Sequence, residues 1–93
     1  MDQHRVEDVL RSFTGVTGAV VLGVSDAVWG ERVVAVVTEA GQGVLSPDDL
    51  LSASAALLAP AERPRDVHIL DEFPISANGK IDRNALKSLF SPA

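Results

Sequence analysis

Residues 19–38 read AVVLGVSDAVWGERVVAVVT, two apolar and largely β-branched runs on either side of a more polar segment. The first run covers residues 19–24 and the second covers residues 32–38, a pattern typical of two strands. Residues 25–31 between them are expected to form the connecting loop of a hairpin. Because both runs are apolar at nearly every position, neither face of the resulting sheet can lie against water, and helices are expected to cover both.

Amphipathic helices are predicted before and after this hairpin. The first has apolar residues at i, i+3, i+4 and i+7 and is expected to stop at Gly15. Its apolar positions are Val6, Val9, Leu10 and Phe13. The second has Ser46 as its N-cap and Pro47 as its first residue, and Pro60 marks its end. Its expected apolar stripe consists of Leu50, Leu51, Leu57 and Leu58.

The rest of the chain adds one strand and one helix. Val67 and Ile69 alternate with His68, which predicts a third strand at residues 66–70 with the histidine on the other side. After a loop, Asp82 can cap a final helix. The apolar face of that helix is expected to be Leu86, Leu89 and Phe90. The predicted order is αββαβα, an α+β domain with a small three-stranded sheet packed with helices.

Length and composition exclude several classes of protein. The chain of 93 residues is expected to be a single domain spanning residues 1–93. Its net charge of -5 argues against a nucleic-acid partner, which would require a basic face. Without cysteine, and with only two histidines, neither a disulfide framework nor a metal centre is expected. No apolar run approaches the roughly 20 residues of a membrane span, so we expect no membrane partner and a cytoplasmic location.

The charge is distributed unevenly along the chain. Residues 1–72 hold five basic and twelve acidic side chains, whereas residues 73–93 hold three basic and one acidic. Both lysines, Lys80 and Lys87, lie in the second part. Lys87 complements the negative end of the predicted final helix, but Lys80 precedes that helix, where a cation is unfavourable. A solvated loop lysine is the commoner explanation of such a residue, and binding of an anion is the alternative.

The segment around Lys80 carries the most specific signal. Residues 73–83 read FPISANGKIDR, in which the Asn-Gly pair predicts a tight turn because both residues tolerate positive φ. The turn is expected to present Lys80 at its tip, above a base made by Pro74 and an anchoring Ile81. A lysine on a preorganised turn suits the binding of a phosphate or carboxylate as a point charge.

This segment resembles the closing motif of the adenylate-forming enzymes, which include acyl-CoA synthetases, the adenylation domains of nonribosomal peptide synthetases, and luciferases. The family motif is a proline, four variable residues, Gly-Lys, a small apolar residue and often Asp-Arg. The matching residues are Pro74, Gly79, Lys80, Ile81, Asp82 and Arg83.

Three further segments support the resemblance. Residues 21–35 are similar to the family's V-G-V-x-D-x-x-W-G-E-x-x-x-A hairpin, and residues 6–10 are similar to the helix that opens its C-terminal domain. Residues 58–65 fit the stretch before the third strand, with Ala61 and Glu62 where the family usually has an aromatic residue and a lysine. The chain therefore resembles the small C-terminal domain of these enzymes.

The resemblance implies chemistry in two half-reactions. A carboxylate attacks the α-phosphate of ATP to give an acyl-adenylate, and a thiol then displaces AMP. By resemblance, Lys80 is the catalytic cation of the first step, and Gly79 and Lys80 contact ATP or the acyl-adenylate. ATP with Mg, and CoA or phosphopantetheine as the thiol, are expected only together with a large N-terminal ATP-binding domain, which this sequence lacks.

Two functions remain open at this point. The first is a catalytic lid of an acyl or aryl acid ligase, inactive alone, which supplies Lys80 to the large adenylation domain in cis or in trans. The alternative is a non-catalytic interaction module that binds an adenylating enzyme or an acyl or peptidyl carrier protein. Trp29 is interpreted as a packing residue and Glu31 as a solvent residue. Arg83 is expected to pair with a nearby acidic residue, Asp71 or Glu72, or to contact a partner domain.

Overall fold

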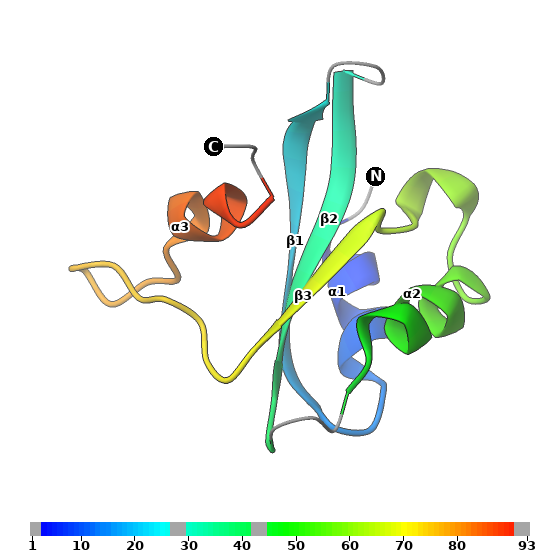
Figure 1. The fold of residues 1–93 in the computed structure, drawn as a ribbon, viewed down its shortest axis with the longest axis horizontal. Helices are drawn as coiled ribbons and strands as arrows, with labels where there is room; N and C mark the ends of the chain where they lie inside the picture. The colour runs from blue at the N-terminus through cyan, green and yellow to red at the C-terminus, as the bar shows by residue number, and fades with distance from the viewer. Residues whose placement is uncertain (1–2, 27–29, 42–44, 91–93) are drawn as a thin grey trace.

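A computed structural model describes residues 3–26, 30–41 and 45–90 of the chain. The elements in chain order are α1 (Gln3–Arg11), β1 (Val16–Asp26), β2 (Gly30–Glu39), α2 (Pro47–Ala55), the 3-10 helix η1 (Pro60–Glu62), β3 (Asp66–Leu70) and α3 (Arg83–Ser88) (Figure 1). The predicted α+β class and the order αββαβα are confirmed, with η1 added between α2 and β3. No helix within these ranges has both the length and the apolar content that crossing a membrane requires.

The three strands form one mixed sheet in the order β1-β2-β3. β1 and β2 pair antiparallel, and β2 and β3 pair parallel. The predicted hairpin is present, but its strands extend further than expected, to the pair Asp26 and Gly30. The loop predicted over residues 25–31 is therefore wrong at residues 25, 26, 30 and 31, because the polar ends of both strands, such as Ser25 and Glu31, continue the pairing while exposed to solvent. Trp29 lies outside the described residues.

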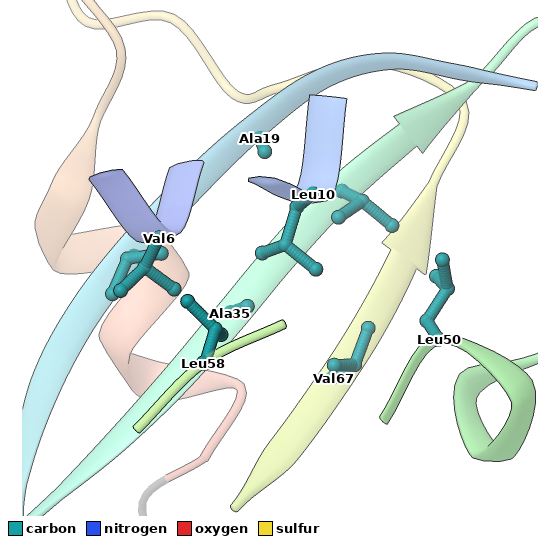
Figure 2. Packing of buried hydrophobic residues seen from close by; sticks show 9 residues of the cluster. Val6, Leu10, Ala19, Ala35, Leu50, Leu58 and Val67 are labelled. Carbon is teal, nitrogen blue, oxygen red and sulfur yellow. The ribbon is translucent and has the colours of Figure 1, made fainter. Parts of the chain in front are cut away.

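Helices cover both faces of the sheet, as the apolar strands require. α1 and α2 lie on one face and α3 lies on the other (Figure 1). The first face buries the cluster shown in Figure 2, made of Val6, Leu10, Ala19, Val21, Ala35, Val37, Leu50, Leu58 and Val67. The second face buries Val20, Leu22, Val24, Val34, Val36, Leu86 and Phe90. The prediction of a sheet covered on both sides is thus confirmed.

The helices on the first face are shorter than their apolar patterns suggested. α1 ends at Arg11, and Phe13 follows in a turn from which it still packs against the first cluster. In α2, Ser46 is the N-cap as predicted, but the helix ends at Ala55. Leu58 is buried beyond that end, whereas Leu57 is 53% exposed. The predicted four-leucine stripe is therefore wrong at Leu57, since helical spacing no longer applies after the last turn.

Side chains of α1 also satisfy the open edge of the sheet. Val21 in the edge strand β1 donates its N–H to Oε2 of Glu7 at 2.8 Å, and its carbonyl accepts from Nε2 of Gln3 at 3.3 Å. Glu7 is only 7% exposed, so this carboxylate is buried together with its partner. At Val21, the edge strand therefore has no free backbone group with which another chain could pair.

The last helix meets the sheet along a narrow stripe. Asp82 caps α3 as predicted, because its Oδ1 accepts from the N–H of Ala85 at 3.1 Å. Leu86 and Phe90, four residues apart, lie on the same side and are buried. Leu89 is 41% exposed, so its predicted place on the buried face is wrong. Only one side of so short a helix reaches the sheet.

The two leucines of α3 allow a matched test of this packing. Leu86→Ala removes a side chain with no exposed surface and should lower the free energy of unfolding by about 2–5 kcal/mol. Leu89→Ala should change it by less than about 1 kcal/mol, because much of that side chain already contacts water. Urea denaturation followed by circular dichroism measures both values. Equal losses in the two variants would contradict the observed orientation of α3.

Candidate functional site

The candidate site is a narrow antiparallel hairpin between β3 and α3, named here the lysine hairpin (residues 74–82). Figure 1 shows this segment, in yellow and orange, extending away from the sheet. The N–H of Asp82 donates to the carbonyl of Pro74 at 2.8 Å, and the N–H of Ser76 donates to the carbonyl of Lys80 at 2.7 Å. Ile75 and Ile81 pair between these two hydrogen bonds. The arm that carries Lys80 is therefore held by its own backbone bonds.

The tip of the lysine hairpin is a turn that depends on glycine. The N–H of Gly79 donates to the carbonyl of Ser76 at 2.9 Å, and Gly79 has a φ of +79°. Asn78 does not have a positive φ, so the predicted reason for the turn holds for the glycine alone. A turn that ends in a left-handed glycine is typical of three-residue hairpin loops. The Oγ of Ser76 also donates to Oδ1 of Asn78 at 3.2 Å, which closes the loop further.

Lys80 follows this turn and is exposed. Within residues 3–26, 30–41 and 45–90, no hydrogen bond or ion pair engages its side chain. The ammonium group is therefore available to an anion that approaches from outside the chain. Gly79 beside it brings no side chain, which lets a ligand come close to the backbone. These observations agree with the predicted placement of both site residues, while their roles remain predictions.

The isoleucines of the hairpin are not anchors. Ile75 is 59% exposed and Ile81 is 37% exposed, so the expectation that Ile81 fixes the base of the turn is wrong. Directly opposed residues of an antiparallel pair share one face, and here that face is turned to solvent. Phe73 anchors the segment instead, packed against the second cluster. Its ring fits where Gly18 has no side chain, since a Cβ at Gly18 would lie 2.9 Å from Cε2 of Phe73.

A second feature, which the sequence did not reveal, is an arginine-lined hollow of about 190 Å³. Its lining residues are Glu31, Arg32, Val33, Pro60, Ala61, Arg63 and Arg65. Nε of Arg63 donates to the carbonyl of Leu58 at 3.2 Å, which fixes that side chain at the rim. Three arginines and one glutamate thus line the hollow, a set of residues whose charge favours a phosphate group. The Arg-Pro-Arg sequence at 63–65 was the available signal, but the contribution of β2 to the hollow appears only in the fold.

The structure also places Arg83 and His68, the other two residues considered from the sequence. Arg83 is exposed, and among the described residues no ion pair joins it to Asp71 or Glu72, so the predicted pairing is wrong. His68 is half-buried, with its ring edge-on to Phe90 at a centroid distance of 4.7 Å. In the described part of the chain, no group of three or more histidine and carboxylate side chains is placed to hold a metal ion.

The glycine at the tip can be tested in isolation. A Cβ at Gly79 would meet no atom within 4 Å, so Gly79→Ala adds only the strain of a left-handed alanine, about 1–2 kcal/mol. The amides of Ser76 and Asp82 should then exchange their hydrogen at least about five-fold faster, because the hairpin opens more often. In Gly79→Asn, these amides should exchange at a rate between those of the parent chain and of Gly79→Ala, since asparagine tolerates a left-handed conformation better than alanine does. Unchanged exchange in Gly79→Ala, measured by NMR, would contradict this account of the turn.

Comparison with known proteins agrees with the fold and the motif. Residues 5–80 match the AMP-binding enzyme C-terminal domain. The chain is 38% identical over 88 residues to the mitochondrial malonate–CoA ligase of Homo sapiens, covering 95% of this chain and 15% of that protein. It is 41% identical over 88 residues to the 4-chlorobenzoate–CoA ligase of Pseudomonas sp. (strain CBS-3), covering 87% of this chain and 16% of that protein.

The structural comparison gives the same result. The crystal structure of apo MatB from Rhodopseudomonas palustris superposes with a TM-score of 0.85 at 27% identity, over 97% of this chain and 18% of that one. The chain thus spans less than a fifth of the length of the relatives it matches. The family match covers most of its residues, including the β1–β2 hairpin and Lys80. This chain belongs to the family of AMP-binding enzyme C-terminal domains.

Proposed function

We propose that this chain is the catalytic lid of an ATP-dependent acyl or aryl acid adenylating ligase, to which it supplies Lys80. The large adenylation domain that receives the lysine acts in cis or in trans. Family membership supports this proposal, as do the two relatives, which are named as CoA ligases. The observation that carries it is the exposed Lys80, without a partner among the described residues, on a hairpin closed by its own hydrogen bonds.

The proposed role of Lys80 is electrostatic. In adenylation, a carboxylate oxygen of the acid attacks the α-phosphorus of ATP, and the bond to pyrophosphate breaks. Two anions approach each other, and negative charge builds on the oxygens around the phosphorus. A cation aimed at those oxygens stabilises the transition state more than the separated reactants. Lys80 provides that cation, and the hairpin holds it so that little reorganisation is needed during the reaction.

The second half-reaction makes different demands on the chain. The thiol of CoA or of a phosphopantetheine arm attacks the acyl carbonyl and expels AMP, so the α-phosphate is no longer the site of bond formation. Lys80 is not required for this step. Both thiol donors carry phosphate groups, and the arginine-lined hollow is a site that suits such an anion. The two relatives named as CoA ligases favour CoA, and a carrier protein is the other acceptor.

A non-catalytic interaction module is the second candidate. The exposed Ile75 and Ile81 favour it, because apolar side chains turned to water often mark a protein contact. An adenylating enzyme or a carrier protein would be the partner. The same isoleucines also suit contact with the large domain of the first proposal, so only an activity measurement separates the two functions.

A cytoplasmic location stays a prediction.

Replacement of Lys80 tests the catalytic role. In an enzyme that contains this chain and a large adenylation domain, Lys80→Ala should lower the adenylation rate by roughly 10²–10³-fold. Pyrophosphate release with hydroxylamine as the trap measures this half-reaction. The thiol step, started from preformed acyl-adenylate, should change little. Lys87→Ala is the matched control, since it removes the chain's other lysine and should leave both rates unchanged. Equal losses in both half-reactions would contradict the assignment.

A reconstitution experiment separates the lid from the interaction module. The chain is added to a large adenylation domain from which the C-terminal domain has been removed, and pyrophosphate release is followed. Stimulation that disappears in Lys80→Ala is expected for a lid. Binding without stimulation, seen by calorimetry, would select the interaction module instead.

A further inference from the structure

The orientation of the lysine hairpin depends on how α3 is fixed to the sheet. The hairpin continues into α3 through Asp82, whose carboxylate caps the helix. α3 is only six residues long and contributes Leu86 to the second cluster, which Phe90 joins just beyond the helix. Apolar packing of this kind resists separation but has little directional preference. A directional contact at the end of α3 would therefore matter for the direction in which the hairpin extends.

Arg32 makes such a contact. Its Nη2 donates to the carbonyl of Phe90 at 3.1 Å, across 58 positions of sequence. This carbonyl lies two residues beyond the last residue of α3, where helix carbonyls lack partners within the helix. The negative end of the helix dipole also favours a cation at this place. Arg32 thus combines a hydrogen bond with a favourable charge at the end of the helix opposite the lysine hairpin.

The surroundings of Arg32 hold its side chain in this position. Arg32 is half-buried in β2, two and four residues before Val34 and Val36, and it shares their face of the sheet. Its Nε is buried and has no hydrogen-bond partner. A buried unpaired donor costs about 1–3 kcal/mol, so the side chain is held in place against a penalty. The ring of Phe90 is fixed as well, edge-on to His68 with the ring planes at 82°.

The hairpin is therefore an arm supported at both ends. Before it, Phe73 occupies the space left by Gly18 in β1. After it, Phe90 is held through its carbonyl by Arg32 and through its ring by His68. Movement of the end of α3 would be passed to Asp82 along the helix, since the elements are continuous. A displacement of about 1 Å at a reacting group can reduce a rate as much as 10²-fold.

We propose that Arg32 is a positioning residue for Lys80: by holding the carbonyl of Phe90, it fixes the end of α3 and thereby the direction of the lysine hairpin. Arg32 acts through the helix and does not touch the reacting atoms. The inference rests on the proposed function of Lys80 in adenylation. A residue of β2 would thus affect adenylation, although the proposed catalytic residue, Lys80, lies in the lysine hairpin.

The test uses three variants. Arg32→Met keeps length and apolar contact but removes every donor, and Arg32→Lys keeps the charge and one donor group. Arg11→Met is the matched control, because Arg11 is an exposed arginine on α1, on the opposite face of the sheet. All three are made in the chain itself for hydrogen exchange, and in the enzyme with its large domain for kinetics.

Hydrogen exchange reports whether the contact holds α3. In Arg32→Met, the amides of Leu86, Leu89 and Phe90, which bond within α3 and its last turn, should exchange at least about five-fold faster. Amides between β1 and β2 should keep their rates. Arg32→Lys should restore most of the protection, and Arg11→Met should match the parent chain. Equal acceleration throughout the sheet would show a general loss of stability and overturn the proposal.

Kinetics report whether the contact positions the lysine. Arg32→Met should lower kcat for adenylation by about ten-fold, with KM for ATP nearly unchanged, and Arg32→Lys should recover most of it. This assay contains no thiol substrate, so binding of a thiol donor in the arginine-lined hollow cannot change the rate. Faster exchange in α3 with a normal adenylation rate would overturn the proposal. Loss of rate without faster exchange would also overturn it, because Arg32 would then act directly.

Lys80→Ala, assayed beside these variants in the same enzyme, distinguishes a failure of the underlying function. If Lys80→Ala retains full adenylation, the lid function fails, and the positioning role fails with it. If Lys80→Ala loses adenylation but Arg32→Met does not, only the positioning role fails. The exchange measurement needs no large domain, so it tests the contact with Phe90 in either case.

Discussion

The burial of both faces of the central strand is the constraint on which the rest of the structure depends. Residues 34–37 of β2 have no exposed surface, and successive residues of a strand point to opposite faces. Each face therefore requires a cover of its own, and burial of one such apolar side chain contributes about 1.5–3 kcal/mol. α1 and α2 cover one face of the sheet and α3 covers the other, so the three α-helices together enclose the central strand.

This constraint also explains why a hairpin extends from the body. β2 and β3 are parallel, so the chain between them must cross over one face of the sheet, and α2, in this connection, lies on the first face (Figure 1). After β3, the chain must reach the second face to place Leu86 and Phe90 there. The segment that makes this crossing belongs to neither layer, and residues 74–82 are stabilised chiefly by hydrogen bonds to one another. A cation on such a segment can be exposed without disturbing the core.

Two polar contacts between residues distant in sequence orient α1 and α3 on the sheet, in addition to the apolar packing. Glu7 binds the outer N–H of Val21, and Arg32 binds the carbonyl of Phe90. The first contact satisfies a backbone group on the outer edge of β1, and the second satisfies one just beyond the last residue of α3. Unsatisfied buried groups cost about 1–3 kcal/mol each, so these contacts favour the observed placements of α1 and α3.

The sequence by itself determined the elements whose causes are local. The alternation of apolar and polar residues predicted β3 at residues 66–70, and the N-cap residues predicted the starts of α2 and α3. The Asn-Gly pair and the family motif located Lys80 at an exposed turn. Tertiary structure decided what depends on partners distant in sequence. It left Leu57, Leu89 and Ile81 in solvent although their apolar character predicted burial, because too few surfaces face them. It also brought Arg32 to Phe90, 58 positions away, and gathered arginines from β2 and residues 63–65 around one hollow. Periodicity along a chain cannot encode such contacts, since they depend on which faces of separate elements meet when the core is buried.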